Sequence, residues 1–401
     1  MPRSLQPSPR VASSTVFAVL GFVSAGWIAR IPAVTTKLDL DTAQLGLLLL
    51  FIAIGSLTAF QFIGRLIERH GSSRTTFWFS LAFSLSILVM AFAPSPWVLA
   101  AGLFIYGFVF GAGDVAMNAQ GVTVERRLGK PIMGSLHGFF SLGALAGAAV
   151  SALVASLGVG LEINLTMIAV LAAALTFWAS LGYVADEPEP VEQKREGGSR
   201  FSLPPRALWP LGIIAFSAAV GEGAMADWGA LYIHDQLGSG EGVAAFGFAA
   251  FSTTMLLGRF ACDRLVLTFG SARVVGVGAV ISAIGLIGGL IPGTTTAAII
   301  GFAVMGIGLA PGFPVIYSAA GSVPGIASGR GVAAVATIGY TGFLAGPPIL
   351  GLLARVSSIR IVFVIVALLI LSIPLFTRTL QRPANPVSAI DPALAVDGVE
   401  D

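Results

Sequence analysis

The chain contains twelve apolar runs, each long enough to cross a lipid bilayer as a helix. They cover residues 13–32, 43–64, 75–93, 97–120, 132–157, 163–184, 208–233, 243–262, 273–292, 297–319, 331–354 and 359–379. A membrane helix needs about 20 mostly apolar residues, whereas a membrane β-barrel would show alternating segments of ~10 residues. The first run is interpreted as a retained helix and not a signal peptide, because eleven more follow it. The sequence therefore predicts an all-α membrane protein.

The composition agrees with lipid as the main solvent of the chain. Hydrophobic residues make up 56% and charged residues 10% of the 401 positions, against roughly 25% charged residues in soluble domains. This excludes a cytosolic enzyme, a nucleic-acid-binding protein and a disordered chain. The formal net charge of +2 also argues against a polyanionic partner.

Motifs for catalysis and metal binding do not appear in the sequence. There is one cysteine, Cys262, and the three histidines are scattered, so neither a thiolate cluster nor a histidine metal site is predicted. No phosphate-binding loop, nucleophile elbow or His-Glu-x-x-His motif occurs. We expect no enzymatic activity, no cofactor and no metal. The energy source that is left for transport is an ion gradient, or none.

Basic residues predict how the helices are oriented. An even number of spans puts both termini on one side, and that side then carries eighteen of the 22 lysines and arginines. The opposite side keeps only Arg30, Lys37, Arg355 and Arg360. Because cytoplasmic loops of membrane proteins carry the excess of basic residues, both termini are predicted to be cytoplasmic.

A polar stretch at mid-chain divides the protein into two halves. Residues 186–206 are predicted to form a cytoplasmic linker between a six-helix bundle at 1–185 and another at 207–380, followed by a disordered cytoplasmic tail at 381–401. The halves resemble repeats. Four residues recur 199 positions later, Gly107 and Gly111 as Gly306 and Ala310, and Gly143 and Gly147 as Gly342 and Gly346.

A charged loop follows the second apolar run and recurs after the eighth. The first copy reads Gly64-x-x-x-Glu68-Arg69-x-Gly71-Ser72-Ser73-Arg74, and the second contains Asp263-Arg264. Glycine permits a tight turn with positive φ. An acid here is able to accept backbone N–H groups at the start of a neighbouring helix and to pair with an arginine, which predicts a latch made in one conformation and broken in another. The alternative is positive charge that only sets topology.

The two halves, the linker and this loop resemble the major facilitator superfamily over the whole chain up to the tail. At finer grain, residues 27–32, 114–120, 137–143, 339–342 and 346–348 resemble the MosC-like group of bacterial facilitators. The resemblance implies the major facilitator fold of two pseudo-symmetric bundles, a bacterial inner-membrane location, and a central cavity lined by helices 1, 4, 7 and 10. An arginine that many drug exporters carry in helix 4 is replaced here by Gly107, and their Gly-Pro motif of helix 5 lies instead at Gly346-Pro347 in helix 11.

Three acids lie inside predicted spans, where each costs roughly 2.5–3.5 kcal/mol on insertion scales. They are Asp114, Glu222 and Asp227. Spacing puts Gly107, Gly111, Asp114 and Asn118 on one helix face. That face is predicted to line the solute path, with a Gly-x-x-x-Gly packing seam as the alternative.

Roles are assigned to these acids as hypotheses. Glu222 is expected to carry a coupling proton, with Asp114 and His137 as further candidates, and Asp227 to form an outer gate pair with Arg30. Glu222 and Asp227 lie five positions apart and would face one point only if glycines break the helix. Static structural pairs are the alternative, and His137 is otherwise an interhelical hydrogen-bond donor.

Four aromatic residues are expected beside the cavity, because tyrosine and tryptophan offer a flat apolar face and one polar group. These are Trp27, Trp228, Tyr317 and Tyr340. The two tryptophans serve equally as anchors at the membrane interface. We therefore predict a monomeric secondary transporter for a small polar solute, proton-coupled, working by alternating access. The alternatives are an exporter of amphipathic drugs and a non-transporting receptor or scaffold of the same fold.

Overall fold

The computed structural model describes residues 6–186 and 204–380, and within these ranges twelve helices are long and apolar enough to cross a membrane. This confirms the twelve predicted spans, while the predicted tail and most of the linker lie outside the described residues. The first six spans use α1 (Pro9–Ile28), α3 (Thr42–His70), α4 (Ser72–Ala91), α5 (Pro96–Leu128), α6 (Met133–Ser156) and α7 (Leu161–Ser180), with the short α2 (Ile31–Lys37) after α1. The second six use η2 (Arg206–Leu208), α8 (Trp209–Leu231), η3 (Tyr232–Gln236), α9 (Glu241–Phe269), α10 (Ser271–Leu290), α11 (Thr295–Leu309), α12 (Gly312–Ala320), α13 (Ser328–Val356), α14 (Ile359–Leu371) and η4 (Ile373–Leu380).

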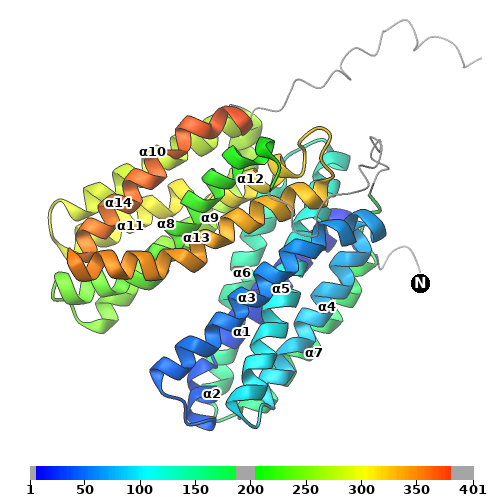
Figure 1. Ribbon diagram of the computed structural model, residues 1–401, viewed down its shortest axis with the longest axis horizontal. Helices are drawn as coiled ribbons and strands as arrows, with labels where there is room; N and C mark the ends of the chain where they lie inside the picture. Colours follow the sequence, from blue (N-terminus) through cyan, green and yellow to red (C-terminus); the bar gives the residue numbers. More distant parts are fainter. Residues whose placement is uncertain (1–5, 187–203, 381–401) are drawn as a thin grey trace, which may run out of the picture.

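The helices form two bundles that meet at one end and diverge at the other (Figure 1). In the N-terminal half α1 packs on α6 and α7, and α5 packs on α3 and α4; in the C-terminal half α8 packs on α13, and α11 packs on α9 and α10. The predicted repeat is visible in the packing. A Cβ on Gly107 would lie 2.0 Å from the carbonyl oxygen of Ile52, and one on Gly306 would lie 2.3 Å from that of Phe251. Gly306 lies 199 positions after Gly107, and Phe251 lies 199 positions after Ile52.

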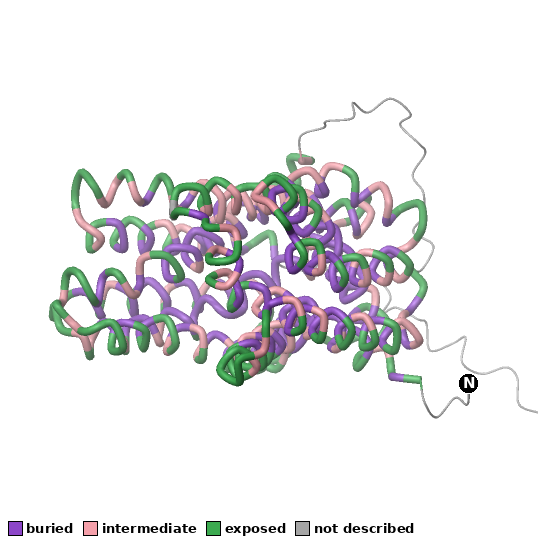
Figure 2. The backbone as a smooth tube through the Cα atoms, turned by 90° about the horizontal axis from the view of Figure 1, so that it is seen from below, coloured by how far each residue is buried: buried purple, intermediate pink, exposed green. Residues whose placement is uncertain are grey.

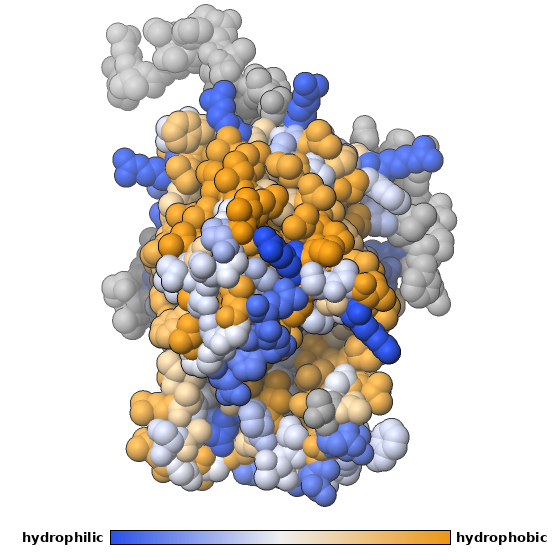
Figure 3. Space-filling view, turned by 90° about the vertical axis from the view of Figure 1, so that its left-hand side faces the viewer, coloured by the Kyte–Doolittle hydropathy of each residue, from blue (hydrophilic) through white to orange (hydrophobic). Residues whose placement is uncertain are grey.

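The halves touch along five main pairings, α3 with α13, α6 with α9, α5 with α12, α5 with α13, and α6 with α12. We call the end where these contacts lie the closed end. It holds the turns from α3 to α4 and from α9 to α10. At the opposite, open end the bundles separate, and Figure 3 shows a hollow between them. The chain is therefore captured in a conformation that is open on one side only.

Two predicted loops turn out to be single-residue turns. Helix α3 continues to His70 and α9 to Phe269, so the predicted ends at 64 and 262 were wrong by about two helical turns. Gly71, with φ of 82°, and Gly270, with φ of 80°, separate them from the next helices. The expected positive φ is found at Gly71. Gly64 lies inside the helix instead, where a Cβ would meet the Cα of Arg330 at 3.2 Å.

A break in the tenth span and the continuity of α8 determine which residues of these helices face the centre. The tenth span breaks between Leu309 and Gly312, with Pro311 at the junction, because proline cannot donate the next hydrogen bond. Helix α8 is unbroken around Gly221 and Gly223. Buried residues follow the interior of each bundle and the region where the halves meet (Figure 2), and large apolar side chains such as Leu267, 68% exposed, cover the outside.

Candidate functional site

A polar cluster lies between the two halves, between the closed end and the hollow. The N-terminal half contributes Asp114 and Asn118 from α5 and His137 and Ser141 from α6. The C-terminal half contributes Glu222 from α8, Arg259 from α9, Tyr317 from α12 and Tyr340 from α13. Of these, six are among the residues that the sequence singled out.

Asp114 joins the halves through hydrogen bonds. Its Oδ2 accepts from the Tyr340 hydroxyl at 3.1 Å and its Oδ1 accepts from Asn118 Nδ2 at 3.2 Å. Because the Asn118 amide nitrogen donates to Asp114, its Oδ1 is the acceptor for His137 Nε2 at 3.1 Å. The imidazole of His137 in turn stacks on the ring of Tyr317 with centroids 5.9 Å apart. Asp114, at 6% exposed, thus sits in a chain of polar groups that crosses from one half to the other.

Glu222 has a partner that the sequence did not suggest. Arg259 Nη2 lies 3.4 Å from both carboxylate oxygens of Glu222, and Arg259 Nη1 donates to Ser141 Oγ at 2.7 Å. Ser141 belongs to the opposite half, so this arginine also bridges the halves. Arg259 lies inside α9 and is 8% exposed, and no role was predicted for it from the sequence.

The start of α6 at the closed end is capped by two acids. The first N–H groups of a helix have no partner within the helix. Glu125 Oε2 accepts from the backbone N–H groups of Ile132 and Met133 at 2.9 and 3.1 Å. Asp263, from the opposite half, accepts from those of Gly134 and Ser135 at 2.7 and 3.0 Å. One acid from each half therefore satisfies this helix start.

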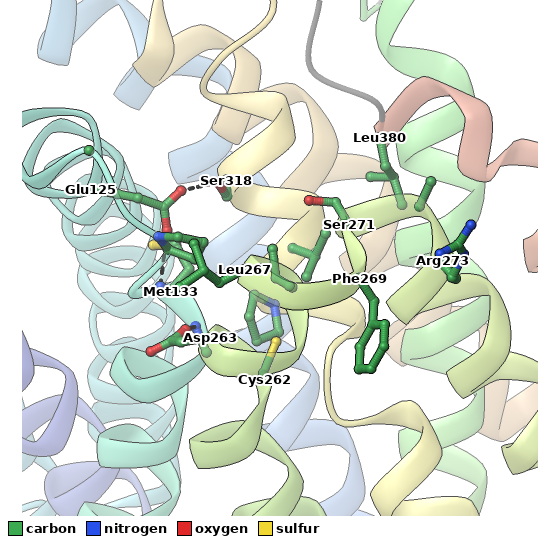
Figure 4. Close-up of a pocket in the computed structure, with 18 residues that line it drawn as sticks. Glu125, Met133, Cys262, Asp263, Leu267, Phe269, Ser271, Arg273, Ser318 and Leu380 are labelled. Atoms are coloured by element: carbon green, nitrogen blue, oxygen red, sulfur yellow. Dashed lines mark hydrogen bonds between the residues drawn. The ribbon is translucent and has the colours of Figure 1, made fainter. Parts of the chain in front are cut away.

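Further contacts close the same end. Ser318 Oγ donates to Glu125, and Figure 4 shows this bond together with Asp263 and Cys262 beside a pocket of about 470 Å³. Arg126 donates to the Gly321 carbonyl oxygen. Where α3 contacts α13, Arg330 binds Glu68 with Nε–Oε1 and Nη2–Oε2 distances of 2.6 and 2.9 Å.

The family follows from sequence matches. The family model of the Major Facilitator Superfamily matches residues 11–266 and 211–394. This chain belongs to the Major Facilitator Superfamily. It is 32% identical over 370 residues to the uncharacterized transporter y4wD of Sinorhizobium fredii, covering 92% of this chain and 96% of that one. It is 30% identical over 350 residues to the membrane protein MosC of Rhizobium meliloti, covering 84% and 82%, which confirms the predicted subgroup resemblance.

Solved facilitators share the fold. The crystal structure of the Escherichia coli fucose:proton symporter FucP matches with a TM-score of 0.77 at 15% identity, covering 94% of this chain and 99% of that one. The structure of FucP in the outward conformation matches with a TM-score of 0.79 at 14% identity, with the same coverage. At this identity the likeness establishes the architecture of two six-helix bundles, as predicted.

This facilitator does not bring the two tryptophans to the polar cluster. Trp27 is 2% exposed and packs against the ring of Tyr106 inside the N-terminal half. Trp228 lies against Gly351 in its own half, 3.3 Å from where a Cβ on that glycine would be. The Trp27 indole lies in the core of the N-terminal bundle in this conformation, away from the polar cluster and from the lipid-facing surface.

Arg30 and Asp227 do not pair in this conformation. Arg30 is 6% exposed and its Nη2 lies 3.3 Å from the carbonyl oxygen of Val159, within the N-terminal half. Asp227 is exposed at the open end and, among the described residues, forms no ion pair. Helix α8 is continuous, so Glu222 and Asp227 point in different directions, as an ideal helix requires.

The two halves of the predicted stripe on the fourth span have different surroundings. Gly107 and Gly111 pack against α3, with a Cβ on Gly111 placed 2.9 Å from the Cα of Ser56. This is the packing seam that was the alternative prediction. Asp114 and Asn118, further along the same helix, reach the cluster. The polar half of the stripe therefore faces the centre, and its glycine half does not.

The arginines and the acids of the two charged loops also differ in their contacts. Arg69, Arg74 and Arg264 are exposed and, within the described part of the chain, form no ion pair. Asp186, the first residue of the predicted solvated linker, accepts from Thr123 Oγ1 at 2.8 Å and from the backbone N–H of Ser72 at the start of α4. Sequence reasoning missed Glu125, Arg259 and Arg330; the spacing of Arg259 and Asp263 by one helical turn was the available signal for a shared face.

Proposed function

We propose that this facilitator is a proton-coupled secondary transporter, which carries a small polar solute across the bacterial inner membrane by alternating access. The observation that supports it most is the polar cluster, because its hydrogen bonds link opposite halves. Asp114 bonds to Tyr340, and Arg259 bonds to Ser141. A solute that replaces these bonds changes how the halves are held together, which is what rocking around a central site requires.

The proposed orientation places the closed end in the cytoplasm. The excess of basic residues lies at the closed end, where α6 contacts α9 and α3 contacts α13. The likeness to FucP in the outward conformation supports the same assignment. On this assignment Arg30 and Asp227 lie on the outer side, and their proposed gate pair forms only after the open end has closed.

Protons are proposed to act at the two carboxylates of the cluster. Glu222 and Asp114 are the acids of the polar cluster, and His137 connects to Asp114 through Asn118. Each carboxylate is bonded to a group that belongs to, or bridges to, the other half. Proton uptake therefore alters contacts that hold this conformation. FucP, whose printed description is a fucose:proton symporter, is consistent with coupling of this kind.

A metabolite-library thermal-shift screen at two pH values identifies the solute, since a ligand that binds the folded state raises its stability. Proteoliposomes then compare the wild type with Asp114→Asn and Glu222→Gln under an imposed pH gradient. We expect the wild type to accumulate solute and to move protons with it, and both variants to lose accumulation. A Glu222→Gln protein that still accumulates solute would contradict its role. Arg355→Gln, an exposed change outside the site, is the control.

An exporter of amphipathic compounds is the second candidate, because aromatic rings surround the cluster. Phe60 and Tyr340 have ring centroids 4.8 Å apart, and Phe313 stacks on Phe343 at 5.9 Å. Competition of diverse hydrophobic cations for one site would favour this candidate. A reconstituted protein that moves neither a solute nor protons would point instead to a receptor or scaffold.

A further inference from the structure

Arg259 has more donor capacity than its neighbours use. A guanidinium presents five N–H groups in a planar fork that matches a carboxylate. In this chain one Nη group donates to Ser141 and the other lies 3.4 Å from Glu222. The Nε of Arg259 is buried and, among the described residues, has no hydrogen-bond partner. A buried donor without a partner is costly, so the site lacks an acceptor.

A second arginine in the same chain shows what a complete pair looks like. Arg330 binds Glu68 through two donors at 2.6 and 2.9 Å, although the Arg330 side chain is 61% exposed. Charge-assisted N–H···O bonds are usually about 2.7–2.9 Å long. The Glu222 oxygens at 3.4 Å are therefore a loose partner for Arg259, even though burial should strengthen the attraction between them.

We propose that Arg259 is the seat for a carboxylate of the transported solute, and that this solute is a small hydroxylated organic acid. The inference rests on the proposed transport function and names its substrate class. The carboxylate of the solute takes the fork of Arg259 and displaces Glu222. Its hydroxyl groups face Tyr317 and Tyr340, whose rings line the same cluster together with His137 and Asp114. Tyrosine hydroxyls both donate and accept, which suits a polyol chain.

Displacement of Glu222 defines the charge that crosses the membrane. Once Arg259 is taken by the solute, the carboxylate of Glu222 has no cation bonded to it, in a cluster that also holds Asp114, Tyr317, Tyr340 and His137. It then takes one proton from water at the open end. One anion and one proton move together, so no net charge is carried. Uptake is accordingly driven by a pH gradient and does not respond to membrane potential.

The same helix connects this seat to the closed end. Arg259 and Asp263 lie one turn apart on α9, and both bond to α6, at Ser141 and at the backbone of Gly134 and Ser135. A carboxylate that draws Arg259 away from Ser141 removes one of the bonds that hold α6 to α9. Binding of the solute thereby weakens the seam that must open for its release.

The test uses the purified full chain in lipid nanodiscs and two matched sets of probes. Gluconate, sorbitol and glucamine are six-carbon polyols that differ in one terminal group, which is an acid, an alcohol or an amine. Glycerate, glycerol and 3-aminopropane-1,2-diol form the three-carbon set. We expect at least one acid to raise the melting temperature at a concentration about tenfold or more below its alcohol and amine partners, a difference of ~1.4 kcal/mol.

Variants of Arg259 test whether its guanidinium group is responsible for the stabilisation by the acid. Arg259→Gln should abolish the stabilisation by the acid, Arg259→Lys should weaken it, and Arg355→Gln should leave it unchanged. If Arg259→Gln does not fold, the Arg259→Lys comparison carries the test. Equal or stronger stabilisation by an alcohol or amine, no stabilisation by either acid, or an unchanged response in Arg259→Lys would overturn the proposal. The binding readout needs no transport, so solute uptake by proteoliposomes judges the proposed function separately. Uptake of the acid that follows a potassium-valinomycin potential would also overturn the electroneutral step.

Discussion

Two seams join the halves at the closed end, and the internal repeat relates them: α6 on α9, and α13 on α3. In the first, the carboxylate of Asp263 accepts two backbone N–H groups of α6. In the second, Glu68 pairs with the side chain of Arg330, and the two side chains are 27% and 61% exposed. At equivalent places in the repeat, one contact is therefore an acid bonded to fixed backbone amides, and the other is an ion pair between two long, partly exposed side chains.

The difference predicts which seam holds the conformation. A buried N–H that loses its partner costs roughly 1–3 kcal/mol, whereas an exposed ion pair contributes about 0–1 kcal/mol and is weakened by salt. The α6–α9 seam also carries Arg259, the cation of the central cluster. We infer that α6 and α9 set the balance between the two conformations, and that α3 and α13 adjust it slightly.

The largest effect is expected from Asp263→Ala, which leaves the N–H groups of Gly134 and Ser135 without acceptors at the closed end. The balance should shift toward opening of that end by roughly 1–3 kcal/mol, or about fivefold to 150-fold. Cys262, the single cysteine, reports this opening because it is 1% exposed in the closed seam. Its rate of alkylation by N-ethylmaleimide in nanodiscs should rise by that factor.

Asp263→Asn is the matched control, because the amide keeps one acceptor oxygen and should give a smaller increase. Alkylation after denaturation must be equal in all variants, which shows that the thiol itself is intact. Unchanged labelling of native Asp263→Ala would mean that the α6 start does not depend on this acid.

A smaller effect is expected from adding one methyl group to each seam. A Cβ on Gly134 would lie 2.5 Å from the Cβ of Cys262 and 2.8 Å from the carbonyl oxygen of Arg259. A Cβ on Gly64 would have its nearest neighbour at 3.2 Å, the Cα of Arg330. Overpacking typically costs about 1–3 kcal/mol, and partial separation of the helices relieves some of it. Gly134→Ala should therefore speed alkylation of Cys262 several-fold, and Gly64→Ala less than about twofold. Equal rates in the two variants would remove the distinction between the seams.

Sequence reasoning reached the parts of this architecture that depend on local chemistry. Helix number follows from the length of apolar runs, and Asp114 with Asn118 faces the centre because residues four apart share a helix face. Arg259 was missed because an arginine near the end of an apolar run has the same local pattern as a loop residue. Its place in the polar cluster is defined by Glu222 and Ser141, which lie on other helices. The burial of Trp27 inside one bundle was equally out of reach, since the sequence does not show which side of an all-apolar helix faces the bundle interior.

The smaller of the two effects of removing an acid is expected from Glu68→Gln, which removes the ion pair with Arg330. Because both side chains reach water, the change should alter Cys262 alkylation by at most about fivefold, in line with about 0–1 kcal/mol. The remaining difference from wild type should shrink further between 50 mM and 500 mM salt, where the screening length falls from about 14 Å to about 4 Å. Asp263→Ala should keep its effect at both concentrations, since its acceptor bonds are short and lie inside the seam. A Glu68→Gln effect as large as that of Asp263→Ala, and insensitive to salt, would show that the two seams contribute equally despite their different chemistry.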